Sequence, residues 1–278
     1  MENSNFIEMP QGIQTWFLDT CVWSEIISSK QNLENFISYF QKNNYFAGLT
    51  LYTIFELSRA KYILKDLDYL FIQMKHNIWI PLFNDDLFDY ELRNYPIKPK
   101  MRWMTIMGLV ENDGIPINLL QKIITFSGFI DSRNDHLQFG KSRFMSLEEF
   151  KKNFPPSENS NYSTDQAYAF SRFNAISYFL SNERNVLEKI GVRDFLPEGI
   201  PSQFARSLFL FYKYYVHGQS PVESDFLDFT HISYTPYFNV YVTEKNVSNV
   251  LNHIKSEGIY FKDLKVIKLT QFMELITK

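Results

Sequence analysis

One stretch decides the predicted fold of this chain: Trp16-Phe17-Leu18-Asp19-Thr20-Cys21-Val22-Trp23. Its first residues form a short, bulky apolar run typical of a buried strand, which stops at an acid followed by a small hydroxyl residue. Ligands of open α/β sheets bind at the carboxyl ends of the strands. We therefore expect Asp19 at the mouth of a cleft, with Thr20 able to cap the next helix. A carboxylate in that place needs a cation, a hydrogen-bond network or water.

The composition limits the choice of function. The chain has 278 residues, 45% of them hydrophobic, which is enough for one large domain or for a small domain carrying a big insertion. The formal net charge is −3, so no global basic field attracts nucleic acid, and any polyanion site must be local or built around metal. The single cysteine, Cys21, excludes an internal disulfide and fits a reducing compartment.

Neither a signal peptide nor a membrane span is predicted. Residues 1–10 lack the basic and apolar regions of a signal peptide. The most apolar helix candidate, residues 207–216, contains Lys213 and is too short to span a bilayer. We therefore expect a cytoplasmic protein with no membrane partner.

The first part of the chain has the rhythm of a parallel α/β sheet. Leu33, Phe36, Ile37 and Phe40 follow the i, i+3, i+4, i+7 spacing of an amphipathic helix. The elements expected after the first strand are this helix over residues 31–42, a strand over 45–49, a helix from Thr50 to about residue 66, and a strand over 78–83.

The rhythm stops between residues 84 and 219. Helices are expected there at about 86–93, 100–110, 116–126, 164–190 and 202–217, with a capping box at 146–149 and a loop at 155–160. The α/β pattern returns with a helix from Ser220, a strand at 239–243, a helix at 246–256, a strand at 264–269 and a helix capped by Thr270. We therefore expect an α/β core of residues 1–83 and 220–278, with residues 84–219 as a helical insertion or cap.

Acidic residues fall where these elements end, on what should be one side of the sheet. Three or more carboxylates that converge without matching Lys or Arg would raise one another's pKa values, and Mg²⁺ or Mn²⁺ removes this conflict. Such a site suits phosphodiester hydrolysis. The acids are Asp19, Glu56 in the helix after the second strand, Asp225 and Asp228 at i and i+3 of one helix, and Glu244 after the strand at 239–243.

At these positions the chain resembles the PIN-domain nucleases. The resemblance covers residues 12–83 and 220–275 and rests on Phe17-Leu18-Asp19-Thr20-Cys21-Val22, on Glu56, and on Ser224-Asp225-Phe226-Leu227-Asp228 leading to Pro236-Tyr237-Phe238-Asn239-Val240-Tyr241-Val242-Thr243-Glu244. It implies a three-layer α/β/α core with a parallel sheet, and a nuclease that leaves a 5′-phosphate and a 3′-hydroxyl.

The resemblance also implies a set of metal ligands. It carries the main metal-binding and catalytic roles to Asp19, Glu56 and Asp228, with Asp225 as a possible partner and Glu244 or Asn239 in fourth place. Many relatives have Asp at both of these last positions. Asn is a weaker ligand than a carboxylate and Glu reaches further, so both departures bear on rate and metal preference.

Each acid also has an ordinary structural explanation. Asp19 could be a helix N-cap, Glu56 could pair with Arg59, Asp225 could favour a helix macrodipole, and Glu244 could be a loop acid. If all of these explanations held at once, the order of the elements would match that of the PIN-domain family only by accident.

Two other enzyme classes are disfavoured. Phosphatases with an aspartate nucleophile carry a second aspartate two residues later, where this chain has Cys21. The chain contains no Gly-rich phosphate loop, so a nucleotide-dependent enzyme is not expected.

Basic residues beside aromatic ones indicate where nucleic acid would bind. Such pairs suit single strands, through phosphate contacts and base stacking. They also occur as ordinary solvated charge. The candidates are Lys98, Lys100 and Arg102 next to Trp103, and Lys141 and Arg143 next to Phe144.

The sequence therefore predicts a nuclease dependent on Mg²⁺ or Mn²⁺ that acts on RNA more readily than on DNA. A non-catalytic protein- or RNA-binding module and a metal-dependent phosphohydrolase of small substrates stay open. So does a homo-oligomer or a regulatory protein partner.

Overall fold

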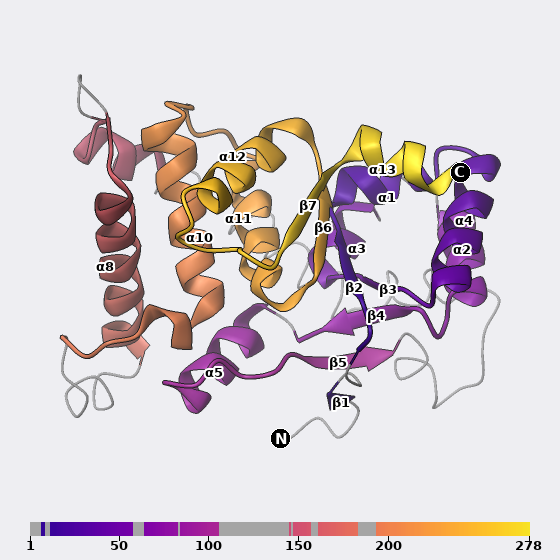
Figure 1. The fold of residues 1–278 in the computed structure, drawn as a ribbon, viewed down its shortest axis with the longest axis horizontal. Helices are drawn as coiled ribbons and strands as arrows, with labels where there is room; N and C mark the ends of the chain where they lie inside the picture. The colour runs from indigo at the N-terminus through magenta and orange to yellow at the C-terminus, as the bar shows by residue number, and fades with distance from the viewer. Residues whose placement is uncertain are drawn as a thin grey trace.

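A computed structural model gives the fold of residues 7–8, 12–57, 64–82, 84–105, 145, 147–156, 161–182 and 193–278. Its centre is a seven-stranded mixed sheet with the order β1-β5-β4-β3-β2-β6-β7 (Figure 1). Strands β4, β3, β2, β6 and β7 are parallel, and β5 runs antiparallel to both of its neighbours. The strands are β1 (Ile7–Glu8), β2 (Thr15–Leu18), β3 (Phe46–Gly48), β4 (Ile78–Pro81), β5 (Arg102–Thr105), β6 (Val240–Thr243) and β7 (Lys265–Lys268).

Helices cover both faces of the sheet, so the architecture is α/β with helical layers on either side (Figure 1). Successive residues of a strand point to opposite faces, and β2 is buried on both. Trp16 and Leu18 therefore pack into one core and Phe17 into the other. The first face is covered by α1 (Thr20–Ile26), α2 (Lys30–Asn43), α3 (Leu51–Leu57), α4 (Leu64–Gln73) and α13 (Leu269–Ile276).

The second face is covered by α10 (Pro201–Phe211), α11 (Asp225–Tyr234) and α12 (Lys245–Ser256). A π-helical segment, η4 (Tyr212–Val216), continues α10, and a 3-10 turn, η5 (Thr235–Tyr237), continues α11. The helix α8 (Thr164–Asn182) packs on α10 at the outer side of this layer (Figure 1). Phe17 stacks on Phe238 and on Tyr241, so aromatic rings fasten this layer to the sheet.

The amphipathic helix predicted over residues 31–42 is confirmed as α2. Leu33, Phe36, Ile37 and Phe40 are its buried residues. The Ser29 side chain accepts a hydrogen bond from the Asn32 N–H and starts the helix, while Asn44 ends it in the left-handed conformation.

The helix predicted over residues 100–110 is wrong in its described part. Residues 102–105 form β5, which pairs with β4 in the register Ile80 to Met104. Trp103 and Met104 are buried, and tertiary pairing prevails over local helix propensity. The central sheet is therefore mixed rather than purely parallel, and the segment 84–219 contributes a strand to it in addition to helices.

Helices are confirmed at three of the places predicted within residues 84–219. They are α5 (Asn84–Asn94), α8 and α10. Residues 147–153 are also helical, as the capping box predicted. The helix predicted at 116–126 lies outside the described residues.

Two predicted helix starts are displaced. The helix expected from Ser220 begins at Asp225. The buried Asp225 carboxylate accepts a hydrogen bond from the Val222 N–H at 3.0 Å, which holds residues 222–224 in a turn. The last helix, α13, begins at Leu269. Its N-cap is Lys268, two residues before the predicted cap Thr270.

In the part of the chain that the structure describes, none of the helices combines the length and the apolar character that crossing a bilayer requires.

Candidate functional site

Asp19 lies where β2 ends, beside the last residue of β6. Its backbone N–H donates to the carbonyl of Val242 at 3.0 Å, one step beyond the paired residues Leu18 and Val242. Its carboxylate accepts from the Thr20 N–H at 2.7 Å and caps α1. The N-cap role is therefore real, and it belongs to Asp19 rather than to Thr20.

The Asp19 carboxylate accepts three further hydrogen bonds. The donors are His231 Nδ1 at 3.0 Å, the Tyr241 hydroxyl at 3.3 Å and the Thr243 hydroxyl at 2.6 Å. Burial alone would raise the pKa of this carboxyl, but the bonds from His231, Thr243 and Thr20 outweigh it and lower the pKa. Asp19 is therefore held as a carboxylate in one fixed orientation.

His231 lies near the predicted site in sequence but was not predicted as a site residue, because a lone histidine is usually structural. It lies in α11, is 1% exposed, and its Nε2 is 3.5 Å from the Thr53 hydroxyl. Burial would lower the pKa of its imidazole, but the carboxylates of Asp19, Glu56 and Asp228 raise it. The only sequence signal was its position three residues after Asp228, on the same helix face.

Glu56 reaches the same place from the other side of β2. It lies in α3, which follows β3, and its Oε2 accepts a hydrogen bond from the Thr20 hydroxyl. Because Thr20 also donates its N–H to Asp19, this residue joins the two acids. Arg59, the alternative partner of Glu56, lies outside the described residues.

Asp225 and Asp228 share one cation, Lys213. The Lys213 ammonium lies 2.6 Å from Asp225 Oδ1 and 2.8 Å from Asp228 Oδ2. Asp225 is fully buried and also accepts from the Tyr214 hydroxyl at 2.6 Å. The expectation that the acids converge without a matching Lys or Arg is therefore wrong.

Lys213 projects from the π-helical segment η4, an element often found at functional sites. Burial lowers the pKa of its ammonium, but Asp228 and Asp225 more than compensate and the pKa is raised. In the sequence, Lys213 served only as an argument against a membrane span. Helical periodicity does not reveal the extra residue per turn of a π-helix, so the position of this side chain could not be predicted.

Lys213 does not fully compensate the electrostatic cost of burying the Asp228 carboxylate. Its burial, together with the neighbouring charges of Asp19 and Asp225, raises its pKa to about 6. Neighbouring carboxylates thus add to the effect of burial, as the sequence predicted, although the Lys213 cation lies among them.

Glu244 and Cys21 lie at the same edge of the sheet. Glu244 directly follows β6 and is exposed. Burial and the charges of Asp19, Glu244 and Asp228 raise the pKa of the Cys21 thiol. Cys21 is therefore a neutral thiol facing three of the predicted site acids.

Asn239 does not join them. It lies just before β6, four residues before Thr243, at the opposite end of the strand from Asp19. Its Oδ1 accepts from the N–H of Thr15 at 2.8 Å and from its hydroxyl at 3.0 Å. The structure thus corrects the proposed fourth-ligand role of Asn239, because four residues of strand separate it from the acids by about 13 Å.

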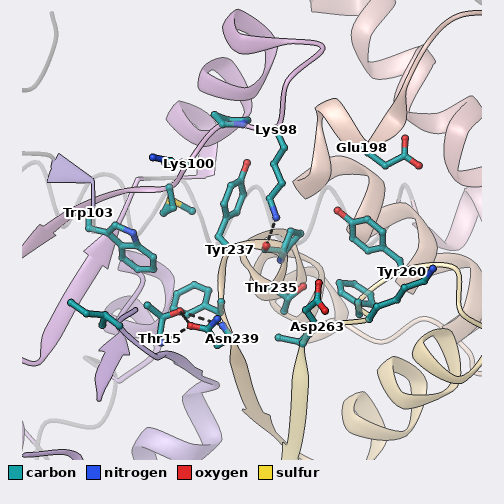
Figure 2. Close-up of a pocket in the computed structure, with 18 of the residues that line it drawn as sticks. Thr15, Lys98, Lys100, Trp103, Glu198, Thr235, Tyr237, Asn239, Tyr260 and Asp263 are labelled. Carbon is teal, nitrogen blue, oxygen red and sulfur yellow. Dashed lines mark hydrogen bonds between the residues drawn. The ribbon is translucent and has the colours of Figure 1, made fainter. Parts of the chain in front are cut away.

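The predicted nucleic-acid residues also lie apart from the acids. Lys98 and Lys100 line a separate pocket whose lining also includes Thr15 and Asn239 (Figure 2). Asp19, Glu56, Asp225, Asp228 and Glu244 are absent from that lining. Arg102 begins β5, while Lys141 and Arg143 lie outside the described residues.

The donor chemistry of the acidic site suits Mg²⁺ or Mn²⁺, because Asp19, Glu56 and Asp228 supply carboxylate oxygens, and burial together with the charges of Asp19 and Asp225 raises the pKa of Asp228, an effect that a cation would oppose. In the structure, however, Asp228 is paired with Lys213. Within the described ranges, no group of three or more His, Cys, Asp or Glu side chains is arranged so that it could hold a metal ion. In a metal-bound form, the Asp228 carboxylate would be shared between the metal and Lys213, which contacts its Oδ2 at 2.8 Å.

Comparisons of this chain with models of protein families, with curated proteins and with solved structures find no match.

Proposed function

We propose that this chain is a PIN-like nuclease that hydrolyses RNA with the help of Mg²⁺ or Mn²⁺. The observation that carries the proposal is the convergence of Asp19, Glu56 and Asp228 around His231, from β2, α3 and α11. Residues distant in sequence meet at the carboxyl end of parallel strands, the usual place for a ligand in an open α/β sheet.

The chain's own residues would have distinct tasks in this reaction. Asp19, Glu56 and Asp228 would hold the ion, which when bound supplies a water of lowered pKa. His231, Tyr241 and Thr243 keep the Asp19 carboxylate in one orientation. Lys213 offsets the charge of Asp225 and Asp228.

The test is cleavage of labelled RNA and single-stranded DNA by the pure protein with Mn²⁺ or Mg²⁺. We expect RNA cleavage that Asp19→Asn or Asp228→Asn reduces by about 100-fold or more, the scale of removing one preorganised charge from an active site. The matched control is Asp89→Asn. Asp89 is an exposed acid that forms an i,i+4 ion pair with Arg93 within one helix, at 3.9 Å. Its replacement should leave the rate unchanged.

Absence of cleavage of either polymer with both metals would contradict the proposal, and so would cleavage that survives Asp19→Asn. A chromogenic phosphate ester serves as a third substrate. Hydrolysis of this ester without cleavage of RNA would favour the small-substrate phosphohydrolase instead.

A specific observation also favours a second candidate, a non-catalytic binding module. Asp19 already accepts four hydrogen bonds, one of them from His231, and Lys213 neutralises charge that a metal would otherwise meet. If the acids only stabilise the fold, Mn²⁺ will not raise the melting temperature of the protein. For a metal-binding nuclease, Mn²⁺ raises it, and Asp228→Asn removes the increase.

A further inference from the structure

The pocket away from the acids is a candidate site for a second ligand. Its volume is about 820 Å³, within the range of ligand pockets in proteins. It is bordered by the starts of β2 and β6, by the segment 98–103 that leads into β5, by η5, and by the loop 259–264 before β7 (Figure 2). These segments come from both parts of the predicted α/β core and from the predicted insertion.

Aromatic rings form much of the pocket lining. Trp103, Phe238 and Phe261 are buried and pack into the core, whereas Tyr237 and Tyr260 are only half-buried. Figure 2 shows the Tyr237 and Tyr260 rings on facing sides of the pocket. Tyr237 is fixed by a hydrogen bond of 2.6 Å to the buried Glu91. The two rings therefore offer a preformed surface on which a flat ligand can stack.

Three lysines surround these rings. The Lys98 ammonium lies 5.2 Å from the centroid of the Tyr237 ring and donates one hydrogen bond, to the Pro236 carbonyl at 2.7 Å. Lys100 forms a single exposed pair with Glu8 at 3.3 Å, a kind of contact worth little in water. Lys262 is exposed and forms no ion pair with any described residue. Ammonium donors thus remain for an anionic group.

Hydrogen-bonding groups also line this pocket. The Tyr260 hydroxyl has no hydrogen-bond partner among the described residues, and Glu198 and Asp263 add exposed carboxylates. Carboxylates accept hydrogen bonds from the exocyclic amino groups of nucleobases. A ligand that is only anionic would be repelled by these acids, and one that is only apolar would leave three lysines unused.

From this combination we infer that the pocket binds a nucleotide, with the base against Tyr237 and Tyr260 and the phosphate held by a lysine of the pocket lining. The nucleotide can come from two sources, a free mononucleotide or one residue of a single-stranded RNA. The site is distinct from the acidic cluster, because Thr15 and Asn239 border it four residues before Asp19 and Thr243 on the same strands.

Isothermal titration of the full chain with AMP, CMP and UMP, and with a short single-stranded RNA, tests the inference without any cleavage assay. Chelator is present, and the RNA is added to Asp19→Asn protein so that it stays intact. We expect saturable binding that the double variant Lys100→Ala/Lys262→Ala weakens by about tenfold, because each lysine contributes a charged contact. Asp263→Ala should weaken binding of AMP and CMP more than that of UMP, because its carboxylate can accept from an exocyclic amino group that UMP lacks.

The matched control is Lys30→Ala/Lys42→Ala, which removes the same charge from two exposed lysines of α2, on the other face of the sheet. Binding by both mononucleotides and RNA identifies a free nucleotide as a sufficient ligand. Binding by RNA alone identifies a strand. No saturable binding up to millimolar concentration overturns the inference, and so does equal weakening by the two double variants. Both results are independent of nuclease activity.

Discussion

Lys213 is the side chain on which the arrangement of the acidic site most depends. It is 6% exposed, and its ammonium contacts two carboxylates within 2.8 Å, one of them fully buried. Breaking a buried ion pair by removing one partner is costly, because the other charge then stays buried without compensation.

Replacing Lys213 with Met should therefore lower the free energy of unfolding by about 3–5 kcal/mol, as for other buried pairs. Urea denaturation measures this loss. The double variant Lys213→Met/Asp225→Asn should recover part of it, because the buried charge is removed as well. A loss below about 1 kcal/mol, the scale of an exposed pair, would show that Lys213 contributes little to the fold.

At this scale the sequence predicted the acids but not their partners. Asp19, Glu56 and Asp228 were singled out because each lies just after a strand or in a helix, in an order that resembles the PIN-domain nucleases. Lys213 and His231 were not, since each contacts an acid only through the packing of η4 and α11 against the sheet. Their neighbours in sequence do not reveal that packing.

Among the secondary-structure elements, β2 and β6 determine where the functional groups lie. Their parallel register runs from the pair Trp16 and Val240 to the pair Leu18 and Val242. Asp19 and Thr243 follow this register at one end, while Thr15 and Asn239 precede it at the other. The two ends of the same strand pair thus serve the acidic site and the aromatic pocket.

Asn239→Ala should consequently act on stability and not on catalysis. It removes the two hydrogen bonds that its Oδ1 accepts from Thr15, each worth about 0.5–1.5 kcal/mol. Thermal denaturation should show the loss, while the rate of RNA cleavage per folded molecule stays within about twofold of the wild type. A fall in rate of the size expected for Asp19→Asn would instead restore Asn239 to the metal site.

Periodicity predicted the helices and strands well where one face is buried. It failed for β5, since a four-residue strand has too few alternations to oppose a helical reading. It also misplaced the start of α11, because the turn there depends on the distant Lys213 through Asp225.

For the molecule as a whole, Lys213 implies that folding does not depend on the proposed metal, because it already offsets part of the charge of Asp225 and Asp228. The sheet and its two hydrophobic cores are complete without any bound ion.

Removal of metal with EDTA should thus abolish RNA cleavage while the protein stays folded and melts cooperatively. Circular dichroism should give the same spectrum with and without chelator. Added Mn²⁺ should raise the free energy of unfolding only by the mass-action amount, about 2.7 kcal/mol at one hundred times the dissociation constant, with a matching rise in the melting temperature. Loss of the folded signal in EDTA would assign the metal a structural role instead.

The tryptophans provide an optical test of how the layers are coupled. All four are buried, with Trp16 and Trp23 in the core on one side of the sheet and Trp79 and Trp103 in the core on the other. Their fluorescence therefore carries two spatially separate signals, and a chain stripped of either pair would emit from a single layer. Unfolding curves of the two variants, each keeping one tryptophan pair, then report on one core each. If the two curves coincide, both cores melt as one cooperative unit.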